Sequence, residues 1–268
     1  MDADALAALA SAALDESLSA GADLADVSVS AGSSRQVEVR DNRIVAVMAH
    51  QAREVVVRAV VGRRVGMYRL HSLAENDVRS GARSAVEVAR GADPDPDFID
   101  LPHPEEQPDA PCGLFDPAIA SLDLARLRSW AADNVASAVD AVPAARISGV
   151  VAAFSSAGVL VNSNGVRVAD EGTLLTLDFF AVMRKGDDAG SYFGFSEARE
   201  LGGIAPDGIA LRAARQAARF LAARDLPSGR YPLVLAPLAS YDLFRRIAHA
   251  ASAEEHQRKR SFFSGRVG

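Results

Sequence analysis

The chain is poor in cysteine: Cys112 is the only one among its 268 residues. A single cysteine cannot form a disulfide within the chain, and it cannot supply a zinc site built from several cysteines. Its loop also offers no neighbouring group that would activate a nucleophile. The sequence therefore predicts a fold held by an apolar core, in a reducing compartment such as the cytoplasm.

The chain also lacks a basic excess and any long apolar run. Its formal net charge is −6, whereas a surface that binds the phosphates of nucleic acids has to be strongly basic. No apolar stretch approaches the ~20 residues that span a bilayer, and the amino terminus carries Asp2 and Asp4 where a signal peptide would be basic. These absences predict a soluble, cytoplasmic protein that binds neither nucleic acid nor membranes.

Residues 1–92 carry the pattern of a helix, an antiparallel meander and a second helix. Leucines at helical spacing predict the first helix over residues 3–18. The spacing from Ser72 to Glu75 is typical of a capping box, which would begin a second helix that ends at Gly91. Between the helices, alternating apolar and polar residues predict strands at 26–30, 35–40, 43–48, 54–61 and 65–69.

Residues 93–120 differ in composition from the sequence on either side. From Asp93 to Asp109 there are five prolines and seven carboxylates but no lysine or arginine. Prolines keep such a segment extended and its like charges repel one another. We interpret it as a solvated linker between two parts of the fold; a tract that binds a metal or a cationic partner is the alternative.

Residues 121–268 repeat the helix-plus-meander pattern. Helices are predicted at 123–142 and 209–224, with a last one from Tyr241. Strands are predicted at 147–154, 158–162, 172–183 and 191–195, with a short buried strand at 233–236. Two such units in tandem predict an α+β fold, in which a broad antiparallel sheet carries helices packed on it, rather than a doubly wound parallel sheet.

The last helix reads as truncated, because the residues that follow it need a surface to pack against. Phe262 and Phe263 are adjacent, and the chain stops five residues after the second of them. Exposed together, they would form an apolar patch that favours self-association. We therefore expect that a further domain is absent from this sequence. The residues beyond about Glu254 are then frayed, packed across a homodimer contact or swapped between two copies.

Six motifs lie at residues 39–44, 63–66, 85–96, 161–165, 226–235 and 260–268. In this order and at this spacing they resemble the amino-terminal half of the TldD/PmbA family of metallopeptidase-related proteins of bacteria and archaea. The resemblance implies an α+β amino-terminal domain and a β-rich carboxy-terminal domain that is absent here. It also implies a pair of unlike subunits, one of which holds zinc, that together cleave unfolded or small modified peptides.

The sequence departs from the family's catalytic motif. Active members carry His-Glu-x-x-x-His upstream of a Ser-x-Phe-x-Gly segment, which is residues 261–265 here. In that register Phe244 replaces the first histidine, Arg245 replaces the glutamate and only His249 remains. Arginine provides no base to activate water. The resemblance therefore implies the non-catalytic PmbA (TldE) type, with no cofactor of its own and a TldD-like partner subunit that holds the zinc.

The other candidate metal ligands are His249, His256 and Glu254. On a continuous helix the two histidines would stand ~10 Å apart along the axis, too far to share one zinc with bonds of ~2.1 Å. A packed or interface position for His249 and a surface position for His256 are the alternatives. The sequence therefore assigns this chain neither a catalytic nor a metal-binding residue.

A cationic group near the end of the chain is the candidate contact for a peptide substrate or a partner subunit. It consists of Arg245, Arg258, Lys259 and Arg260. Positive charges beside a cleft favour a peptide carboxylate or an acidic partner. The simpler interpretation is that residues 258–260 complement the dipole of the helix that ends there.

Two other functions stay open at this point. The full-length protein could be a divergent metallopeptidase that combines His249 with ligands from the rest of a longer chain. Alternatively, it could be a non-enzymatic module that binds peptides or proteins. If the genome encodes an adjacent relative with an intact His-Glu-x-x-x-His motif, the paired-subunit hypothesis is favoured over both of these functions.

Overall fold

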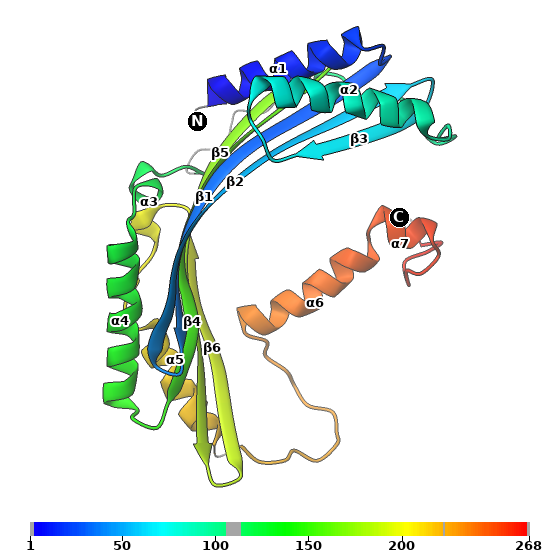
Figure 1. Ribbon diagram of the computed structural model, residues 1–268. Coiled ribbons are helices and arrows are strands. Elements are labelled where there is room, and N and C mark those ends of the chain that lie inside the picture. The colour runs from blue at the N-terminus through cyan, green and yellow to red at the C-terminus, as the bar shows by residue number, and fades with distance from the viewer. Residues whose placement is uncertain (1–2, 106–113, 222, 267–268) are drawn as a thin grey trace. The chain divides into compact units, whose positions relative to one another are not determined.

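A computed structural model describes residues 3–105, 114–221 and 223–266 (Figure 1). The chain divides into two compact units, Met1–Ala223 and Arg224–Gly268. Cys112 and residues 106–109 of the predicted acidic linker lie outside the described residues. The predicted division into residues 1–92, 93–120 and 121–268 stays a prediction.

One six-stranded sheet forms the framework of the first unit, in the order β3-β2-β1-β4-β5-β6. Every neighbouring pair of strands is antiparallel, which confirms the predicted α+β fold with a broad antiparallel sheet. The strands are β1 (Leu24–Arg40), β2 (Arg43–Val61), β3 (Arg64–Leu70), β4 (Arg146–Asn162), β5 (Arg167–Lys185) and β6 (Asp188–Ala198).

The strands are longer than the sequence pattern predicts. β1 joins the strands predicted at 26–30 and 35–40, and β4 joins those predicted at 147–154 and 158–162. The predicted breaks are wrong because the residues between them stay paired on both sides: Ser33 of β1 lies opposite Gln51 of β2 and Ser155 of β4. Backbone pairing therefore continues through segments whose side chains are small and polar.

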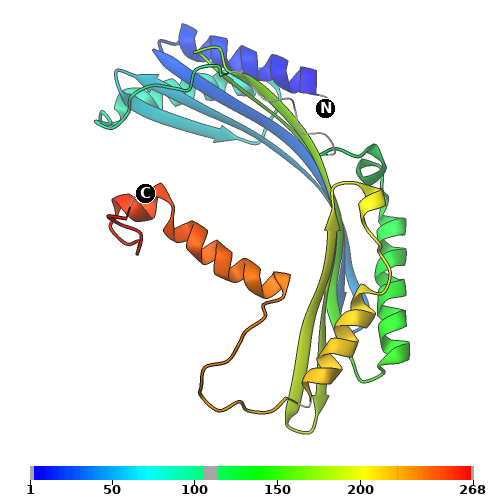
Figure 2. The same ribbon diagram turned by 180° about the vertical axis from the view of Figure 1, so that it is seen from behind.

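The long helices of the first unit pack on one face of this sheet (Figures 1 and 2). The odd-numbered side chains of β1 and β4 point toward them, since successive residues of a strand alternate between faces. Two apolar clusters result, one around Val27 and Val57 and one around Val37 and Leu177. The helices are α1 (Ala3–Ser19), α2 (Glu75–Gly91), α4 (Leu124–Ala141) and α5 (Ile209–Phe220), with short turns α3 (Pro117–Ala120) and η1 (Leu201–Gly203).

The predicted start of α4 is confirmed, and the predicted start of α2 is wrong. α4 begins after Asp123, whose carboxylate accepts a hydrogen bond from the Arg126 backbone amide at 2.7 Å. α2 begins at Glu75, so the predicted capping box at Ser72 is wrong. The Ser72 hydroxyl instead accepts from the Ala74 amide at 3.2 Å and donates to the Asp77 carboxylate at 2.6 Å, which closes a turn before the helix.

The first part of the predicted acidic linker is extended but fixed to the sheet. The side-chain amide of Asn162 donates to the Pro102 carbonyl at 2.7 Å, and that of Asn164 donates to the Leu101 carbonyl at 2.8 Å. Hydrogen bonds from Asn164 and His103 lower the pKa of the Asp100 carboxyl. The turn between β4 and β5 therefore anchors the segment at residues 100–103.

The second unit consists of α6 (Pro237–Ala250) and α7 (Ala253–Gln257) after a segment without regular structure. The predicted strand at 233–236 is wrong: Leu233 and Val234 are 77% and 96% exposed, and this segment pairs with no strand in the described part of the chain. An apolar run needs a hydrogen-bonding neighbour to become a strand. Among the described helices, none is both long enough and apolar enough to cross a membrane.

Two glycines let helices approach the outer strands closely. A Cβ atom on Gly66 of β3 would lie 2.3 Å from the Ala85 carbonyl oxygen of α2, and one on Gly190 of β6 would lie 2.2 Å from the Ala217 carbonyl oxygen of α5. The obstructing atoms belong to helix backbone, which cannot rotate aside as a side chain can. Both ends of the sheet therefore depend on a glycine at the helix contact.

We predict that Gly66→Ala lowers the free energy of unfolding by about 1–3 kcal/mol, the usual cost of overpacking a core. Urea unfolding followed by circular dichroism measures this difference. Gly202→Ala is the matched control, because a Cβ atom there meets nothing within 4 Å. Equal stability of the two variants would contradict the close packing of α2 on β3.

Candidate functional site

The sequence-predicted site residues all lie in the second unit. α6 carries Arg245 and His249, and α7 carries Glu254 and His256. Lys259 has a φ angle of 54°, the left-handed conformation that turns the chain after α7. The three cationic residues 258–260 therefore follow a helix end, as their pattern predicts.

Carboxylates of the same unit already pair with the arginines of this group. The guanidinium of Arg258 lies 3.1 Å from the Glu254 carboxylate, and that of Arg260 lies 2.7 Å from the Glu255 carboxylate. Arg245 lies 3.6 Å from Asp242, and all the side chains of these three pairs are exposed except that of Glu255, which is 15% exposed. Exposed pairs of this kind contribute little to stability and exchange partners readily. The role of these cations in partner or peptide contact stays a prediction.

The candidate metal ligands do not share one continuous helix. His249 is near the end of α6 and His256 is in α7, with a break at residues 251–252 where the Ser252 hydroxyl caps α7. Both imidazoles are exposed. In the ranges that the structure describes, no group of three or more His, Cys, Asp or Glu side chains could hold a metal ion.

The segment after α7 folds back on the end of α6. The Ser261 hydroxyl donates to the Ala250 carbonyl and accepts from the Phe263 amide at 2.9 Å. The rings of Phe262 and Phe263 lie 4.4 Å apart between centroids, and they are 63% and 36% exposed. The Ser-x-Phe-x-Gly segment is therefore a compact turn with an apolar surface, and the predicted self-association through it stays a prediction.

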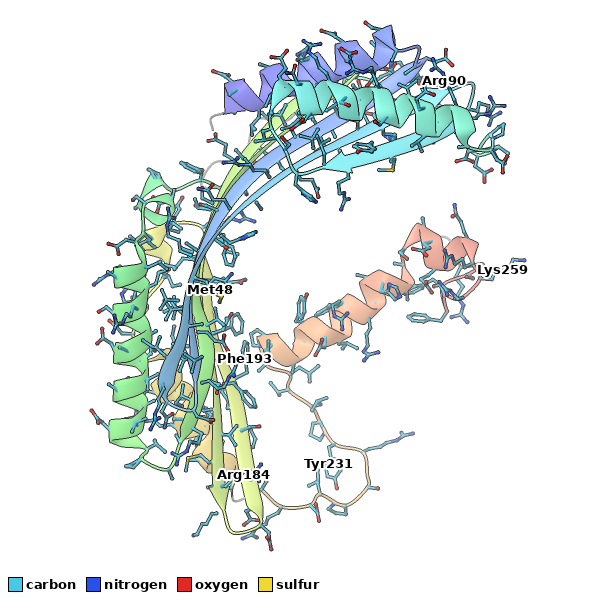
Figure 3. The ribbon with its side chains drawn as sticks, in the orientation of Figure 1. Met48, Arg90, Arg184, Phe193, Tyr231 and Lys259 are labelled. Atoms are coloured by element: carbon cyan, nitrogen blue, oxygen red, sulfur yellow. The ribbon has the colours of Figure 1, made fainter. Side chains whose placement is uncertain are left out.

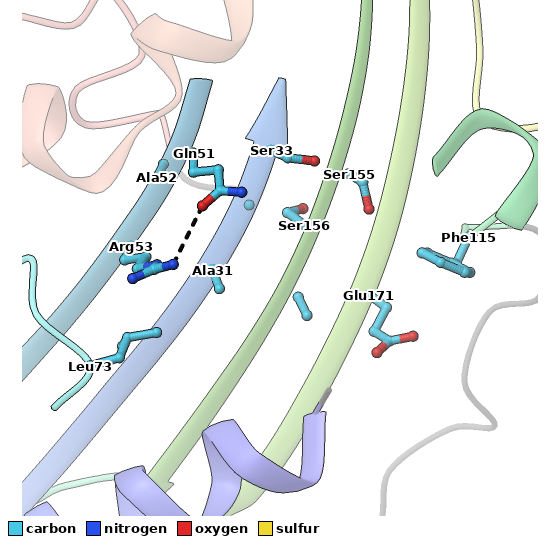
Figure 4. A pocket seen from close by; sticks show the side chains of 12 residues that line it. Ala31, Ser33, Gln51, Ala52, Arg53, Leu73, Phe115, Ser155, Ser156 and Glu171 are labelled. Atoms are coloured by element: carbon cyan, nitrogen blue, oxygen red, sulfur yellow. Dashed lines mark hydrogen bonds between the residues drawn. The ribbon is translucent and has the colours of Figure 1, made fainter. Parts of the chain in front are cut away.

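An open hollow lies on the helix face of the sheet, in the gap between the α1–α2 and α3–α4 layers (Figure 4). Its volume is about 600 Å³. Small residues of β1 and β4, among them Ser33 and Ser155, form its floor, while Arg53 and Glu171 lie on opposite sides of it. Among the described side chains, the one buried polar atom without a hydrogen-bond partner is Ser264 Oγ, in the other unit. Among the described residues, the lining of the hollow therefore holds no buried polar side-chain atom that lacks a partner.

The sequence analysis missed a second surface, the face of the sheet opposite the helices. It exposes phenylalanine side chains: Phe180, Phe193 and Phe195 are 43%, 40% and 43% exposed. Figure 3 shows Phe193 on the side of the sheet away from α4. Strand register brings these rings together, since Phe193 of β6 lies directly opposite Phe180 of β5. The rings of Phe193 and Phe195 lie 5.9 Å apart between centroids.

Two carboxylates lie among these rings. Asp178 of β5 has Phe195 opposite it on one side and Val150 on the other, and Glu197 follows Phe195 two residues later on the same face. Burial raises the pKa of the Asp178 carboxyl, and the negative charge of Glu197 raises it further. Within the described chain neither carboxylate forms an ion pair. The face is therefore apolar and locally anionic.

The geometry of the first unit defines the class of the protein: an α+β fold whose single antiparallel sheet carries its long helices on one face. Residues 117–221 match the sequence profile of the PmbA/TldA metallopeptidase central domain. This match over part of the chain confirms the resemblance to the TldD/PmbA family of metallopeptidase-related proteins that the motifs predict.

Solved structures share this fold over nearly the whole chain. TldE from Thermococcus kodakarensis superposes with a TM-score of 0.80 at 21% identity, over 98% of this chain and 59% of that one. A protein of Bacteroides thetaiotaomicron, described as a candidate modulator of DNA gyrase, gives a TM-score of 0.88 at 19% identity, over 97% and 60%. A protein of Thermotoga maritima with the same description gives 0.82 at 17% identity, over 98% and 59%.

At these identities the likeness establishes the fold. The chain spans about three fifths of the length of each of these proteins. None of the curated proteins compared with it by sequence matches.

We predict that Asp178→Asn stabilises the protein at neutral pH. The pKa of the Asp178 carboxyl is higher in the folded chain than in the unfolded chain. The folded protein therefore loses stability as pH rises above the pKa of the unfolded state, and it loses none where the carboxyl is protonated in both states. Thermal unfolding at pH 7 should shift upward by about 1–2 °C, or about 0.5 kcal/mol. Below about pH 3 the difference should vanish.

Asp170→Asn is the control for this measurement, since it removes the same charge from an exposed position of β5. It should leave the unfolding temperature unchanged at both pH values. A lower unfolding temperature for Asp178→Asn at pH 7 would mean that the carboxylate has a stabilising partner.

Proposed function

We propose that the protein is a PmbA/TldE-like subunit of a heteromeric TldD/TldE-type metallopeptidase that acts in the cytoplasm on unfolded or small modified peptides. In this proposal the subunit has no catalytic metal of its own, and the zinc belongs to a TldD-like partner. The family match and the likeness of fold to TldE support this choice of subunit.

One observation carries the assignment of a silent subunit: the identity of two residues on α6. Phe244 and Arg245 stand where active family members have a histidine ligand and a glutamate base, and both side chains are exposed, by 66% and 58%. A phenyl ring has no atom that binds zinc, and a guanidinium repels the ion and accepts no proton. These residues do not fit a metal, so we assign no step of peptide hydrolysis to them.

The sheet provides two edges for an extended peptide. β3 and β6 are the outer strands, with 7 and 11 residues respectively, and each pairs with a neighbour on one side. A peptide can add to such an edge as a further strand through backbone hydrogen bonds that do not depend on its sequence. That mode of binding suits unfolded substrates, and the chemistry would then come from the partner.

The cationic group is the proposed contact to that partner or to a peptide carboxylate. Arg258 and Arg260 have carboxylates of their own chain beside them, so an incoming carboxylate would exchange with Glu254 or Glu255. Exchange between exposed ion pairs costs little free energy. The group would thus favour an acidic surface mainly through the rate and orientation of encounter.

We predict that the purified chain holds no stoichiometric zinc, because Phe244 and Arg245 remove a ligand and a base. Elemental analysis by inductively coupled plasma mass spectrometry after dialysis measures the content. One zinc per chain that is lost in His249→Ala but kept in His256→Ala would contradict the proposal and favour a divergent metallopeptidase.

We also predict that the protein alone cleaves no peptide, and that a metal-bearing TldD-like relative gains activity or changes specificity when it is added. A fluorogenic unfolded peptide reports the rate. Replacing Arg258, Lys259 and Arg260 together by alanine should raise the concentration needed for half of the effect about tenfold, or about 1.4 kcal/mol.

Arg184→Ala is the control in this titration, because it removes a cation outside the predicted contact group. It should give the same curve as the unmodified protein. A relative that is indifferent to the protein would favour a stand-alone binding module, and cleavage by the protein alone would favour the divergent enzyme.

A further inference from the structure

The face of the sheet opposite α1, α2, α4 and α5 carries a surface that the proposed function does not use. We call it the Phe patch, and it consists of Val150, Asp178, Phe180, Phe193, Phe195 and Glu197. Singly exposed phenylalanines are common on protein surfaces, but these three occupy adjacent positions on neighbouring strands. Contiguous rings on a sheet face indicate a surface that is covered in the working state.

The carboxylates of the Phe patch limit the kind of partner that can bind it. Asp178 is partly buried beside the rings, and the negative charge of Glu197 acts on it. In the same cross-strand row, Glu38 lies beyond Val150, and its carboxylate pairs with Arg40. Arg40 thus offsets the charge of Glu38, whereas Glu197 has no ion pair among the described residues.

The cations near this row are engaged elsewhere, because Arg40 pairs with Glu38 and the guanidinium of Arg199 lies beside Gly172 of β5. Two further arginines lie farther away. Arg146 belongs to the row of Val182, which is four residues from Asp178 along β5, or about 13 Å. Arg184 lies farther along the same strand. Because charges in water are screened beyond about 8 Å, neither arginine compensates the carboxylates.

A purely apolar partner would bury Asp178 and Glu197 without a counter-charge, which is costly. An acidic peptide or an anionic membrane would meet like charge. A segment that has apolar side chains and also lysine or arginine satisfies both features, because guanidinium groups pair with carboxylates and stack on aromatic rings.

We infer that the Phe patch binds a peptide segment that combines apolar side chains with arginine or lysine. The occupant inserts its apolar residues between Phe180, Phe193 and Phe195, and its cations pair with Asp178 and Glu197. These side chains are not among the residues assigned to the proposed peptidase partnership, although Phe193, Phe195 and Glu197 belong to β6, so the inference does not rest on that partnership.

Fluorescence anisotropy with the whole chain tests the inference. The probes are three labelled twelve-residue peptides that contain leucine and phenylalanine, with arginine, glutamine or glutamate at the remaining positions. The unmodified protein should bind the arginine peptide at least tenfold more tightly than the glutamine peptide, and the glutamate peptide least. Equal affinity for all three would overturn the role of the carboxylates.

Variants separate the patch from the rest of the surface. Phe193→Ala should weaken binding of the arginine peptide about tenfold, as central aromatic contacts do. Its control is Phe220→Ala, which removes a 49% exposed phenylalanine from α5 and should change nothing. Equal losses in the two variants would overturn the location.

A second pair of variants tests the charges without removing an aromatic ring. The double variant Asp178→Asn with Glu197→Gln should reduce the preference for the arginine over the glutamine peptide to below threefold. Its control, Glu171→Gln on the helix face, should preserve that preference. An unchanged preference in the double variant would overturn the inference.

Two other occupants would also overturn it. Sedimentation equilibrium that shows a dimer of the unmodified chain, a monomer for Phe193→Ala and no peptide binding would assign the patch to a second copy. Binding to vesicles of anionic lipid that exceeds binding to the arginine peptide would assign it to a membrane surface.

Discussion

The first unit depends on the pairing of β1 with β4. These two strands stay in register from Asp26 opposite Asn162 to Val39 opposite Gly149. One apolar cluster lies under α1 and α2 and the other under α4 and α5, and both draw side chains from β1 and β4. A slip of one residue would turn the buried side chains of both clusters to the opposite face. The register of one strand pair therefore sets the packing of all four helices.

The same constraint separates the sheet into two chemically different faces. Alternation places valines such as Val27 and Val151 toward the helices and leaves Phe180 and Asp178 on the other side. The helix face is covered by the four helices except at the hollow between them, with glycines where α2 and α5 come closest. The opposite face keeps both apolar and charged groups in solvent, a combination that stability alone does not explain. We interpret it as a binding surface on a rigid support.

Local signals in the sequence predicted much of the fold. Asp123 identified the start of α4, and the break predicted between the strands at 35–40 and 43–48 is a turn in which Asp41 and Asn42 have positive φ angles. The apolar run at 233–236 misled the analysis, because a strand needs a partner that no local pattern supplies. The serines and alanines in the middle of β1 led the analysis to predict a break. The strand continues there because β2 and β4 form hydrogen bonds with its backbone on both sides.

Of the two candidate surfaces, local sequence signals predicted one and not the other. Motif spacing placed Phe244, Arg245 and His249 on one helix, and α6 has them there. The Phe patch had no linear signal, because Phe180 lies at an even position of β5 and Phe193 at an odd position of β6. Only the register between the two strands shows that they share a face. Functional surfaces assembled across strands are thus the part that sequence reasoning alone could not reach.

Native mass spectrometry of this protein mixed with a metal-bearing TldD-like relative tests the central claim most directly. The account predicts a heteromeric species that contains both chains, with the zinc retained by the relative when the species is dissociated in the gas phase. Two separate sets of homomers, or zinc that remains with this protein after dissociation, would contradict it.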